Sequence, residues 1–297
     1  MTQTPKELIE QWLQRRLSPT QWEWLQHSLI AIEQSNSDKA LYIALGMAPR
    51  KLGKHDLNLN DKELAQANAA SQGWHPSDWS IDGAARILTL LNLAKTKPDE
   101  FELTLQSLFA HADVSEAVIY YRALGLFPYS SSFDNLIGQG LRTNMKAVFE
   151  AIAHNNPYPA KHFDDHRWNH MILKALFIDS ALFPILDLDE RANPELAQIL
   201  CNYAQERWSA NRSVTAELWR CVGPYATNTM LTDLARASQS DNRLEHCGAM
   251  LALSQCPLTE ADVYLATYPE TAQAIANAEI TWDTLTTDIA TEQQRIH

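Results

Sequence analysis

Helix-start signals recur along the whole chain and constrain its fold more than any other feature. Ser18-Pro19 and Asn193-Pro194 each place a capping side chain before a proline at the first helical position. Asp113 and Glu116 have the spacing of a capping box. Apolar residues return at i, i+3 and i+4 between the caps, without an alternating strand pattern bounded by hairpin turns. We therefore predict an all-α fold of roughly 13 to 16 helices joined by short links.

The arrangement of these helices is less constrained than their existence. We find no fixed repeat period with recurring signature residues, so we expect a degenerate HEAT-like α-solenoid or an irregular array of helical hairpins. Two turn-rich stretches, residues 127–133 and 155–160, are too short to be flexible linkers. We therefore expect residues 1–297 to form a single helical domain with a soft waist at one of these places.

The composition excludes several classes of protein. The 297 residues carry a net charge of −12, which disfavours binding to nucleic acid or to an anionic membrane face. The N-terminus lacks the pattern of a signal peptide, and apolar runs are too short for an integral membrane segment. The four cysteines form no C-x-x-C pair and are expected to be buried thiols. We expect an acidic, cytoplasmic, globular protein.

The richest candidate binding region lies between residues 168 and 224, where aromatic, guanidinium and carboxylate groups occur at helical spacing. Asp179 is spaced to share a helix stripe with Trp168 and Ile172, so we expect it near the apolar side. A carboxylate there needs a partner, which an arginine from the 187–220 region could supply. A structural ion pair is the favoured interpretation, and one wall of a polar pocket is the alternative.

Aromatic residues and arginines are paired twice within this region. Tyr203 and Arg207 share a helix side at i, i+4, and Trp219-Arg220 repeats the pairing. Aromatic faces beside guanidinium groups suit a planar or anionic ligand. The alternative is that the tryptophans anchor the core while the arginines reach water. The candidate ligand-binding set is Asp179, Arg191, Tyr203, Glu206, Arg207, Trp219 and Arg220.

Histidines spaced by four residues raise the question of a metal site. His166 and His170 would align on one helix, but Asp164 is placed to cap that helix, which leaves His162 outside it. Arg167 stands where the metalloprotease helix motif requires its glutamate. Ordinary surface histidines are therefore favoured, and we predict neither a metal nor a cofactor.

Known catalytic patterns are missing from the sequence. It contains no G-x-S-x-G elbow, no phosphate-binding P-loop and no dinucleotide fingerprint after a strand. Asp164-Asp165 lacks the further carboxylates of an aspartate-rich diphosphate site. Arg86, which lies in an apolar stripe, must reach a carboxylate or the surface. We assign no catalytic residues.

Several long motifs, in order, resemble the EboA-domain family over roughly residues 40–255. They are A-P-R-K-L-G (48–53), G-W-H-P-S-D-W-S-I-D-G-A-A-R (73–86), L-F-A-H-A-D-V-S-E (108–116), Y-R-A-L-G-L-F-P (121–128), R-T-N-M-K-A-V-F-E-A-I-A-H-N-N-P-Y-P (142–159), W-N-H-M-I-L-K-A-L-F (168–177), L-D-E-R-A-N-P-E-L (188–196), Y-A-Q-E-R-W (203–208) and E-L-W-R-C-V-G-P (217–224). The resemblance implies a bacterial protein encoded in a cluster that makes or moves a secondary metabolite, including export of a sunscreen-pigment precursor in cyanobacteria. It brings no established catalytic residues.

Two hypotheses about function follow. The first is a non-enzymatic scaffold or carrier that binds a small metabolite or a partner protein of the same gene cluster. The second is an enzyme of unrecognised type that uses a polar cluster of Asp179, Arg191, Glu206 and Arg207. The missing nucleophile–base or metal pattern favours the first, whereas a pocket uniting these four residues would favour the second.

Overall fold

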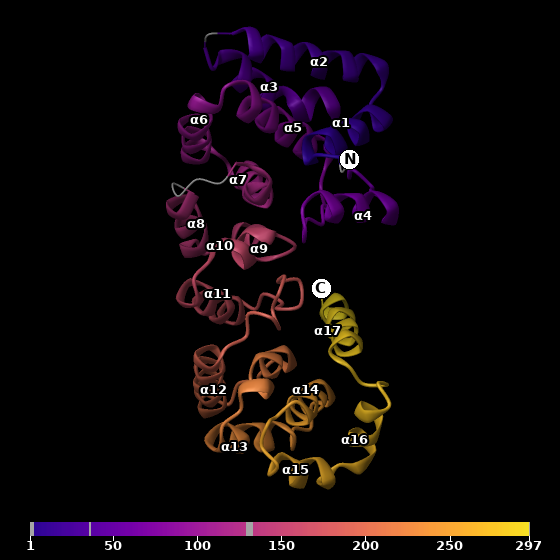
Figure 1. Cartoon of the computed structure of the whole chain (residues 1–297), viewed down its shortest axis with the longest axis vertical. Coiled ribbons are helices and arrows are strands. Elements are labelled where there is room, and N and C mark those ends of the chain that lie inside the picture. Colours follow the sequence, from indigo (N-terminus) through magenta and orange to yellow (C-terminus); the bar gives the residue numbers. More distant parts are fainter. Residues whose placement is uncertain (1–2, 36, 129–132, 297) are drawn as a thin grey trace. The chain divides into compact units, whose positions relative to one another are not determined.

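The computed structural model describes residues 3–35, 37–128 and 133–296. Within these ranges the chain is all-α, as predicted, with no β-strand and one isolated antiparallel bridge between Asp56 and Ser80 (Figure 1). Residues 129–132, which belong to one expected waist, lie outside the described residues. No described helix is long and apolar enough to cross a membrane.

The chain divides into two compact units, Met1–His162 and Phe163–His297. Whether the two units behave as a single domain stays a prediction. The helices of the first unit are α1 (Pro5–Arg16), α2 (Pro19–Gln34), α3 (Lys39–Leu52), α4 (Asp61–Ala70), α5 (Ile81–Thr96), α6 (Pro98–His111), α7 (Val114–Arg122), η1 (Leu124–Leu126), α8 (Phe133–Arg142), α9 (Lys146–Ala153) and α10 (Pro157–His162). Those of the second are α11 (Asp165–Phe177), α12 (Pro194–Ser209), η2 (Ala216–Cys221), η3 (Gly223–Tyr225), α13 (Asn228–Ala237), α14 (Arg243–Ser254), α15 (Ala261–Thr267), α16 (Pro269–Ala276) and α17 (Trp282–Ile296).

The expected caps start the helices. The side chains of Ser18, Asp113 and Asn193 each accept a hydrogen bond from a backbone N–H of the first turn. The described chain has more helices than the roughly 13 to 16 expected, because several last only two turns or less. One of them, η2, is a 3-10 helix whose preceding Thr215 makes no side-chain cap.

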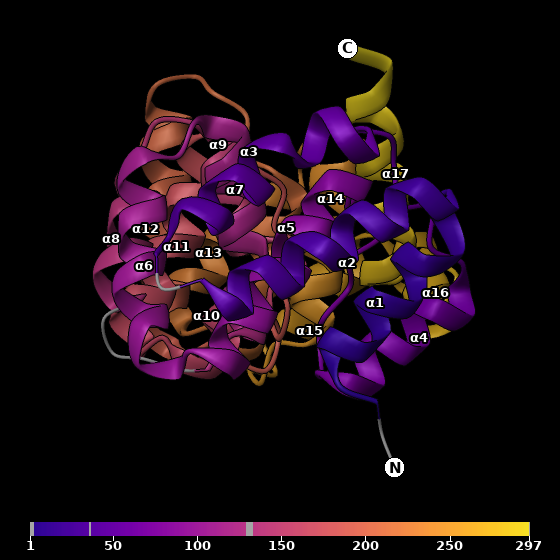
Figure 2. The same cartoon turned by 90° about the horizontal axis from the view of Figure 1, so that it is seen from above.

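The core of the first unit surrounds α5, which is buried from Ile81 to Ala94. Helices α1, α2, α3, α6 and α7 pack against it, and the views in Figures 1 and 2 agree that α1, α2 and α3 lie beside it. Arg86 lies 5% exposed within this core, and its Nη1 is 3.1 Å from Oε1 of Glu116. Of the two alternatives expected for Arg86, a carboxylate or the surface, the structure shows the carboxylate.

The second unit is organised around α14, which packs against η2, η3 and α13 and against the C-terminal helices α15, α16 and α17. Two glycines allow the close approach of these elements. A Cβ on Gly248 would lie 2.8 Å from the carbonyl oxygen of Ala216, and one on Gly223 would lie 2.6 Å from that of Ala252. Helices α11 and α12 also pack together, as predicted from their apolar stripes.

Candidate functional site

A cavity of about 210 Å³ lies within the second unit, between the end of α11, α12, the segment leading into η2, the start of α14, and α17. We call it the α12–α14 cavity. Its lining combines aliphatic side chains with carboxylate, guanidinium, amide and hydroxyl groups. The lining residues are Leu176, Asp179, Tyr203, Arg207, Ser213, Val214, Thr215, Ala216, Asn242, Leu244, Glu245 and Ile289.

Three residues of the predicted ligand-binding set line this cavity: Asp179, Tyr203 and Arg207. Asp179 reaches it in an unexpected way. We expected Asp179 on the apolar stripe of a continuing helix, and this expectation is wrong. Helix α11 ends at Phe177, and Asp179 is exposed with a left-handed φ of 57°.

The turn that ends α11 explains the position of Asp179. The N–H of Asp179 donates to the carbonyl of Leu176 at 3.4 Å, and that of Ser180 donates to the carbonyl of Ala175 at 2.8 Å. This is the Schellman pattern that closes many helices, normally with glycine at the left-handed position. Aspartate tolerates that conformation better than most residues, so the helix stops without a glycine to announce it.

Tyr203 and Arg207 form one side of the cavity from adjacent turns of α12. The Tyr203 hydroxyl is buried and donates to the carbonyl of Leu176 at 3.1 Å, which joins α12 to α11. Burial raises the pKa of Tyr203, so its hydroxyl stays protonated at neutral pH. The Arg207 guanidinium lies 6.0 Å from the Tyr203 ring, and its Nε donates to the carbonyl of Ser213 at 3.0 Å. These contacts orient the guanidinium.

The opposite side contains two residues that we did not predict, Asn242 and Glu245. Asn242 caps α14 by accepting the N–H groups of Leu244 and Glu245. The Glu245 side chain is only 8% exposed, and its Oε2 accepts from the Ser240 hydroxyl at 2.7 Å. Its other oxygen, Oε1, is buried and has no hydrogen-bond partner among the described residues. A buried, half-satisfied carboxylate that lines a cavity is the strongest polar feature of this region.

The sequence did contain a signal for Glu245, but it pointed to another role. Asn242 and Glu245 have the spacing of a capping box, in which the glutamate would bond back to the cap residue. Only half of that pattern forms, because the Glu245 carboxylate accepts from Ser240 instead. Glu245 and Asp179 are also far apart in the sequence, so local patterns could not show that both line one cavity.

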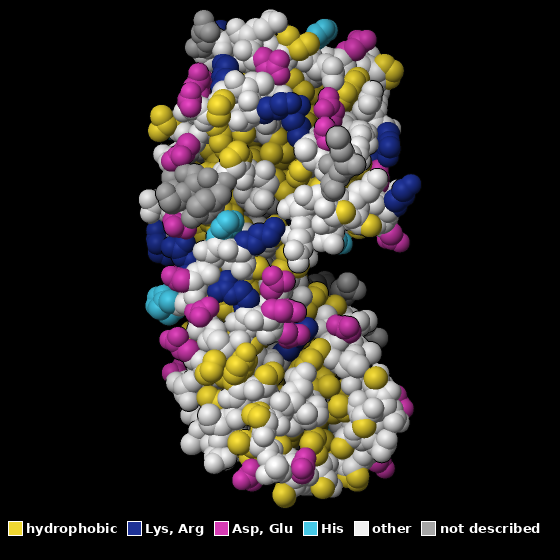
Figure 3. Space-filling view, in the orientation of Figure 1, with side chains coloured by type: hydrophobic (Ala, Val, Ile, Leu, Met, Phe, Trp, Pro, Cys, Tyr) yellow, Lys and Arg dark blue, Asp and Glu magenta, His cyan; other side chains and the backbone are white. Residues whose placement is uncertain are grey.

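The other four predicted ligand-binding residues lie outside the lining of the α12–α14 cavity. Arg191 pairs with Asp165 at 3.1 Å and lies over the Trp168 ring at 4.6 Å. Arg220 forms a bidentate salt bridge with Asp189, in which Nε and Nη2 donate to the two carboxylate oxygens at 2.5 and 2.6 Å. In Figure 3, basic and acidic side chains are interspersed over α11 and the segment that follows it. Both arginines therefore have structural partners.

Trp219 and Glu206 differ greatly in exposure. Trp219 is fully buried and stacks on Trp208, with ring centroids 5.7 Å apart. This is the arrangement of a core anchor. Glu206 is exposed on another side of α12, in an open surface hollow. The polar cluster of Asp179, Arg191, Glu206 and Arg207 considered for an enzyme is therefore not gathered in this cavity.

The predicted histidine pair lies at the surface of the second unit, and Cys201 and Cys221 are buried. The rings of His166 and His170 lie 4.2 Å apart on the exposed side of α11. Within the described part of the chain there is no cluster of three or more His, Cys, Asp or Glu side chains placed to hold a metal ion. Burial raises the pKa of the Cys201 and Cys221 thiols to about 12, far from the range of a nucleophilic thiolate.

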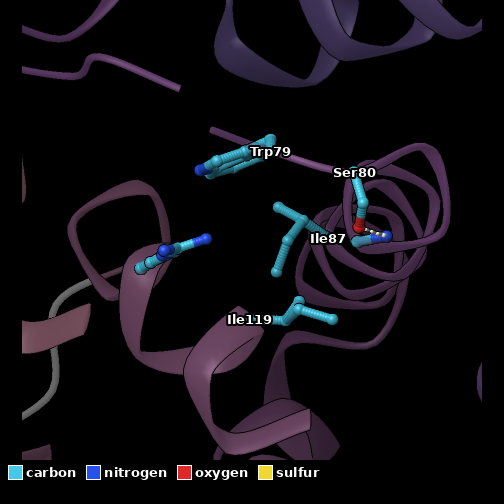
Figure 4. Close-up of a pocket in the computed structure, with 6 residues that line it drawn as sticks. Trp79, Ser80, Ile87 and Ile119 are labelled. Atoms are coloured by element: carbon cyan, nitrogen blue, oxygen red, sulfur yellow. Dashed lines mark hydrogen bonds between the residues drawn. The ribbon is translucent and has the colours of Figure 1, made fainter. Parts of the chain in front are cut away.

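A second, much smaller cavity lies in the first unit. It measures about 20 Å³ and is enclosed by Trp79, Ile87, Ile119 and three neighbours (Figure 4). The Ser80 hydroxyl donates to Asp82, and Arg122 pairs with Asp78 at 2.6 Å, so the polar groups beside this cavity have partners. Its volume suits a single water molecule. It is about a tenth of the volume of the α12–α14 cavity.

Comparison with known proteins agrees with the motifs described above. Residues 5–223 match the family described as metabolite traffic protein EboA. No curated protein and no solved structure matches the chain. The matched segment includes Asp179, Tyr203 and Arg207 but ends before Asn242 and Glu245. Because the match covers well over half of the sequence, the chain belongs to the EboA metabolite traffic protein family.

Proposed function

We propose that this protein is a non-enzymatic carrier that holds a small polar metabolite in the α12–α14 cavity during metabolite traffic. The unpartnered Oε1 of Glu245 carries this proposal. Leaving a buried carboxylate oxygen without a hydrogen-bond donor costs free energy. A ligand that supplies a donor would recover this free energy on binding.

The chemistry of the cavity supports binding over catalysis. Arg207 is oriented by the Ser213 carbonyl, and Asn242 is occupied as a helix cap. The described lining has no histidine, cysteine or lysine beside the hydroxyls of Ser213 and Thr215, and we assign its carboxylates, Asp179 and Glu245, to recognition. A carrier needs only recognition groups, and the lining supplies those.

We further infer a degenerate HEAT-like arrangement for the helices of the family-matched region. Helices that follow one another closely in sequence pack together, such as α2 with α3, and α7 and α8 with α9. Such arrays commonly bind other proteins. We therefore propose that products of the same gene cluster receive or deliver the metabolite. Arg191, Trp219 and Arg220 would act in this scheme by supporting the surrounding structure.

The carrier function can be tested by filling the cavity. Thr215 is exposed at its rim and makes no capping hydrogen bond, so Thr215→Trp should block entry with little cost to folding. Ser209→Trp is the matched control, because Ser209 is exposed on α12 outside the cavity lining. Each variant replaces the wild-type gene in a strain that produces the pathway metabolite.

We expect Thr215→Trp to abolish metabolite accumulation or export, while Ser209→Trp preserves it. Equal protein levels and helical circular dichroism establish that both variants fold. Normal output from a folded Thr215→Trp protein would reject the α12–α14 cavity as the site. Turnover of a pathway intermediate by the purified wild-type protein alone would replace the carrier with an enzyme.

A further inference from the structure

The α12–α14 cavity contains side chains of opposite charge. Arg207 lines it from α12, and Glu245 lines it from α14. Among the described residues, the Arg207 side chain makes one hydrogen bond, which its Nε donates to the Ser213 carbonyl. The two terminal guanidinium nitrogens of Arg207, and the buried Oε1 of Glu245, therefore have no hydrogen-bond partner among the described residues.

From this pairing we infer the chemical class of the ligand, an inference that rests on the proposed carrier function. We propose that the α12–α14 cavity binds a small zwitterionic amine, whose ammonium group meets Glu245 and whose anionic group meets Arg207. Neither charge of such a ligand would enter the cavity without a counter-charge.

The Glu245 side favours an ammonium group over a neutral donor. A buried carboxylate gains more from a charged donor, because charge-assisted hydrogen bonds are shorter and stronger. Asp179 adds a second carboxylate at the exposed edge of the same cavity.

The Arg207 side favours an oxyanion such as a carboxylate. The contact with Ser213 fixes one edge of the planar guanidinium, and the other nitrogens form the fork that recognises two oxygens at once. Fixing the guanidinium before the ligand arrives also lowers the entropy lost on binding. A ligand with ammonium alone would leave this fork unused.

The rest of the lining limits the body of the ligand. Leu176, Val214, Leu244 and Ile289 are aliphatic, and the aromatic Tyr203 has its hydroxyl engaged with the backbone. A volume of about 210 Å³ lies below the usual range for drug-sized ligands. These features fit a short aliphatic chain between the two charges, about the size of an amino acid.

Calorimetric titration of the purified full-length protein at neutral pH and low ionic strength tests this class. The zwitterionic probes are leucine, β-alanine, 4-aminobutanoate, 5-aminopentanoate and 6-aminohexanoate, which cover several separations between the charges. Pentylamine lacks the acid group, and pentanoate lacks the amine. We expect the best zwitterion to bind at least about tenfold more tightly than either single-charge probe, a difference of about 1.4 kcal/mol.

Two substitutions test which cavity residue binds which charged group of the ligand. Glu245→Gln should make the best zwitterion bind no better than pentanoate, and Arg207→Ala should make it bind no better than pentylamine. Glu206→Gln is the matched control, because Glu206 is on α12 but outside the lining, and it should leave every affinity unchanged. This pattern of affinities would distinguish recognition of the two charged ends of the ligand from a general effect of the substitutions on folding.

The zwitterion inference is overturned if pentylamine or pentanoate binds as tightly as every zwitterion. It is also overturned if Glu245→Gln preserves the preference for the zwitterion, or if no zwitterion binds at about 10 mM, a concentration at which weak specific complexes form. The strain experiment with Thr215→Trp distinguishes a failure of the proposed ligand class from a failure of the proposed carrier function. Lost output without zwitterion binding rejects the ligand class alone, whereas normal output rejects the carrier function as well.

Discussion

Two buried glutamates of the second unit differ in how fully their carboxylate oxygens are hydrogen-bonded. Glu217 is 5% exposed, and its two oxygens accept the backbone N–H groups of Leu182 and Phe183 at 3.1 and 2.6 Å. It therefore holds the segment after α11 in place. Glu245 is 8% exposed, but only one of its oxygens has a partner among the described residues. The two side chains are similarly buried, but they differ in how many of their oxygens accept hydrogen bonds.

This difference predicts unequal costs of truncation. Glu217→Ala leaves one buried and one partly buried N–H group without an acceptor and should lower the free energy of unfolding by about 2–4 kcal/mol. Glu245→Ala should cost only about 1 kcal/mol, because a single hydroxyl loses its acceptor. Urea unfolding of the ligand-free variants measures both values. Equal losses of unfolding free energy in the two variants would contradict the proposal that one Glu245 oxygen serves a ligand.

Glu217 should also make stability depend on pH. Burial raises the pKa of Glu217 above its ordinary value of 4.5, despite the lowering effect of the two backbone N–H groups. A carboxyl group with a raised folded-state pKa contributes its full stability below about pH 4.5 and loses part of it as pH rises through the folded pKa.

The stability advantage of the wild type over Glu217→Ala should therefore shrink as pH rises above 4.5. Urea unfolding of both proteins at a series of pH values measures it. Taking the difference between the two proteins removes the titration of the other carboxylates. An advantage that grows with pH would show that the two N–H groups outweigh burial.

At the scale of elements, the α12–α14 cavity depends on how closely α14 approaches η2. Gly248 of α14 faces Ala216 of η2, and these same two elements supply Glu245 and Ala216 to the cavity lining. A methyl group at position 248 would meet backbone, which cannot rotate away. The glycine therefore sets the distance between two cavity walls.

Gly248→Ala should lower the free energy of unfolding by about 1–3 kcal/mol through overpacking and should weaken ligand binding as well. Gly46→Ala is the matched control, because Gly46 also lies within a helix, α3, but has no atom within 4 Å of the added Cβ. The control should be stabilised by about 0.5–1 kcal/mol, since alanine favours helix. Chemical denaturation measures both. A stabilised Gly248→Ala protein would contradict the close approach.

The same scale shows what the sequence could predict. Helix starts were predictable because Ser18, Asp113 and Asn193 form local caps within a few residues. The end of α11 was not, because Asp179 occupies a left-handed position that glycine usually marks. The cavity also lay beyond prediction from local patterns. Its walls join α12 to Glu245 and to Ile289, segments that only tertiary packing brings together.

At the scale of the whole molecule, the family match and the second compact unit have different limits. The match ends at residue 223, whereas the second unit continues through α13 to α17. Helix α14 lies in this later part and packs against η2 and η3. The segment beyond the matched region is therefore an integral part of the second unit and supplies one side of the α12–α14 cavity.

A chain shortened to end at residue 223 should consequently fail to fold its second unit. It would lose the cover that α14 gives to the buried residues Leu218, Trp219 and Cys221 of η2. Two-dimensional NMR should show poorly dispersed amide signals for residues 163–223, whereas the full chain shows dispersed ones. Native-like dispersion in the shortened chain would mean that the C-terminal helices are dispensable for this unit.

The central claim, that the α12–α14 cavity holds the metabolite, is tested most directly by the small molecules that purify with the protein. Wild type, Thr215→Trp and Ser209→Trp are isolated under native conditions from the producing strain, and their extracts are compared by mass spectrometry. We predict one pathway compound in equal proportion to protein for wild type and Ser209→Trp, and its loss from Thr215→Trp. Retention of that compound by a folded Thr215→Trp protein would contradict the claim.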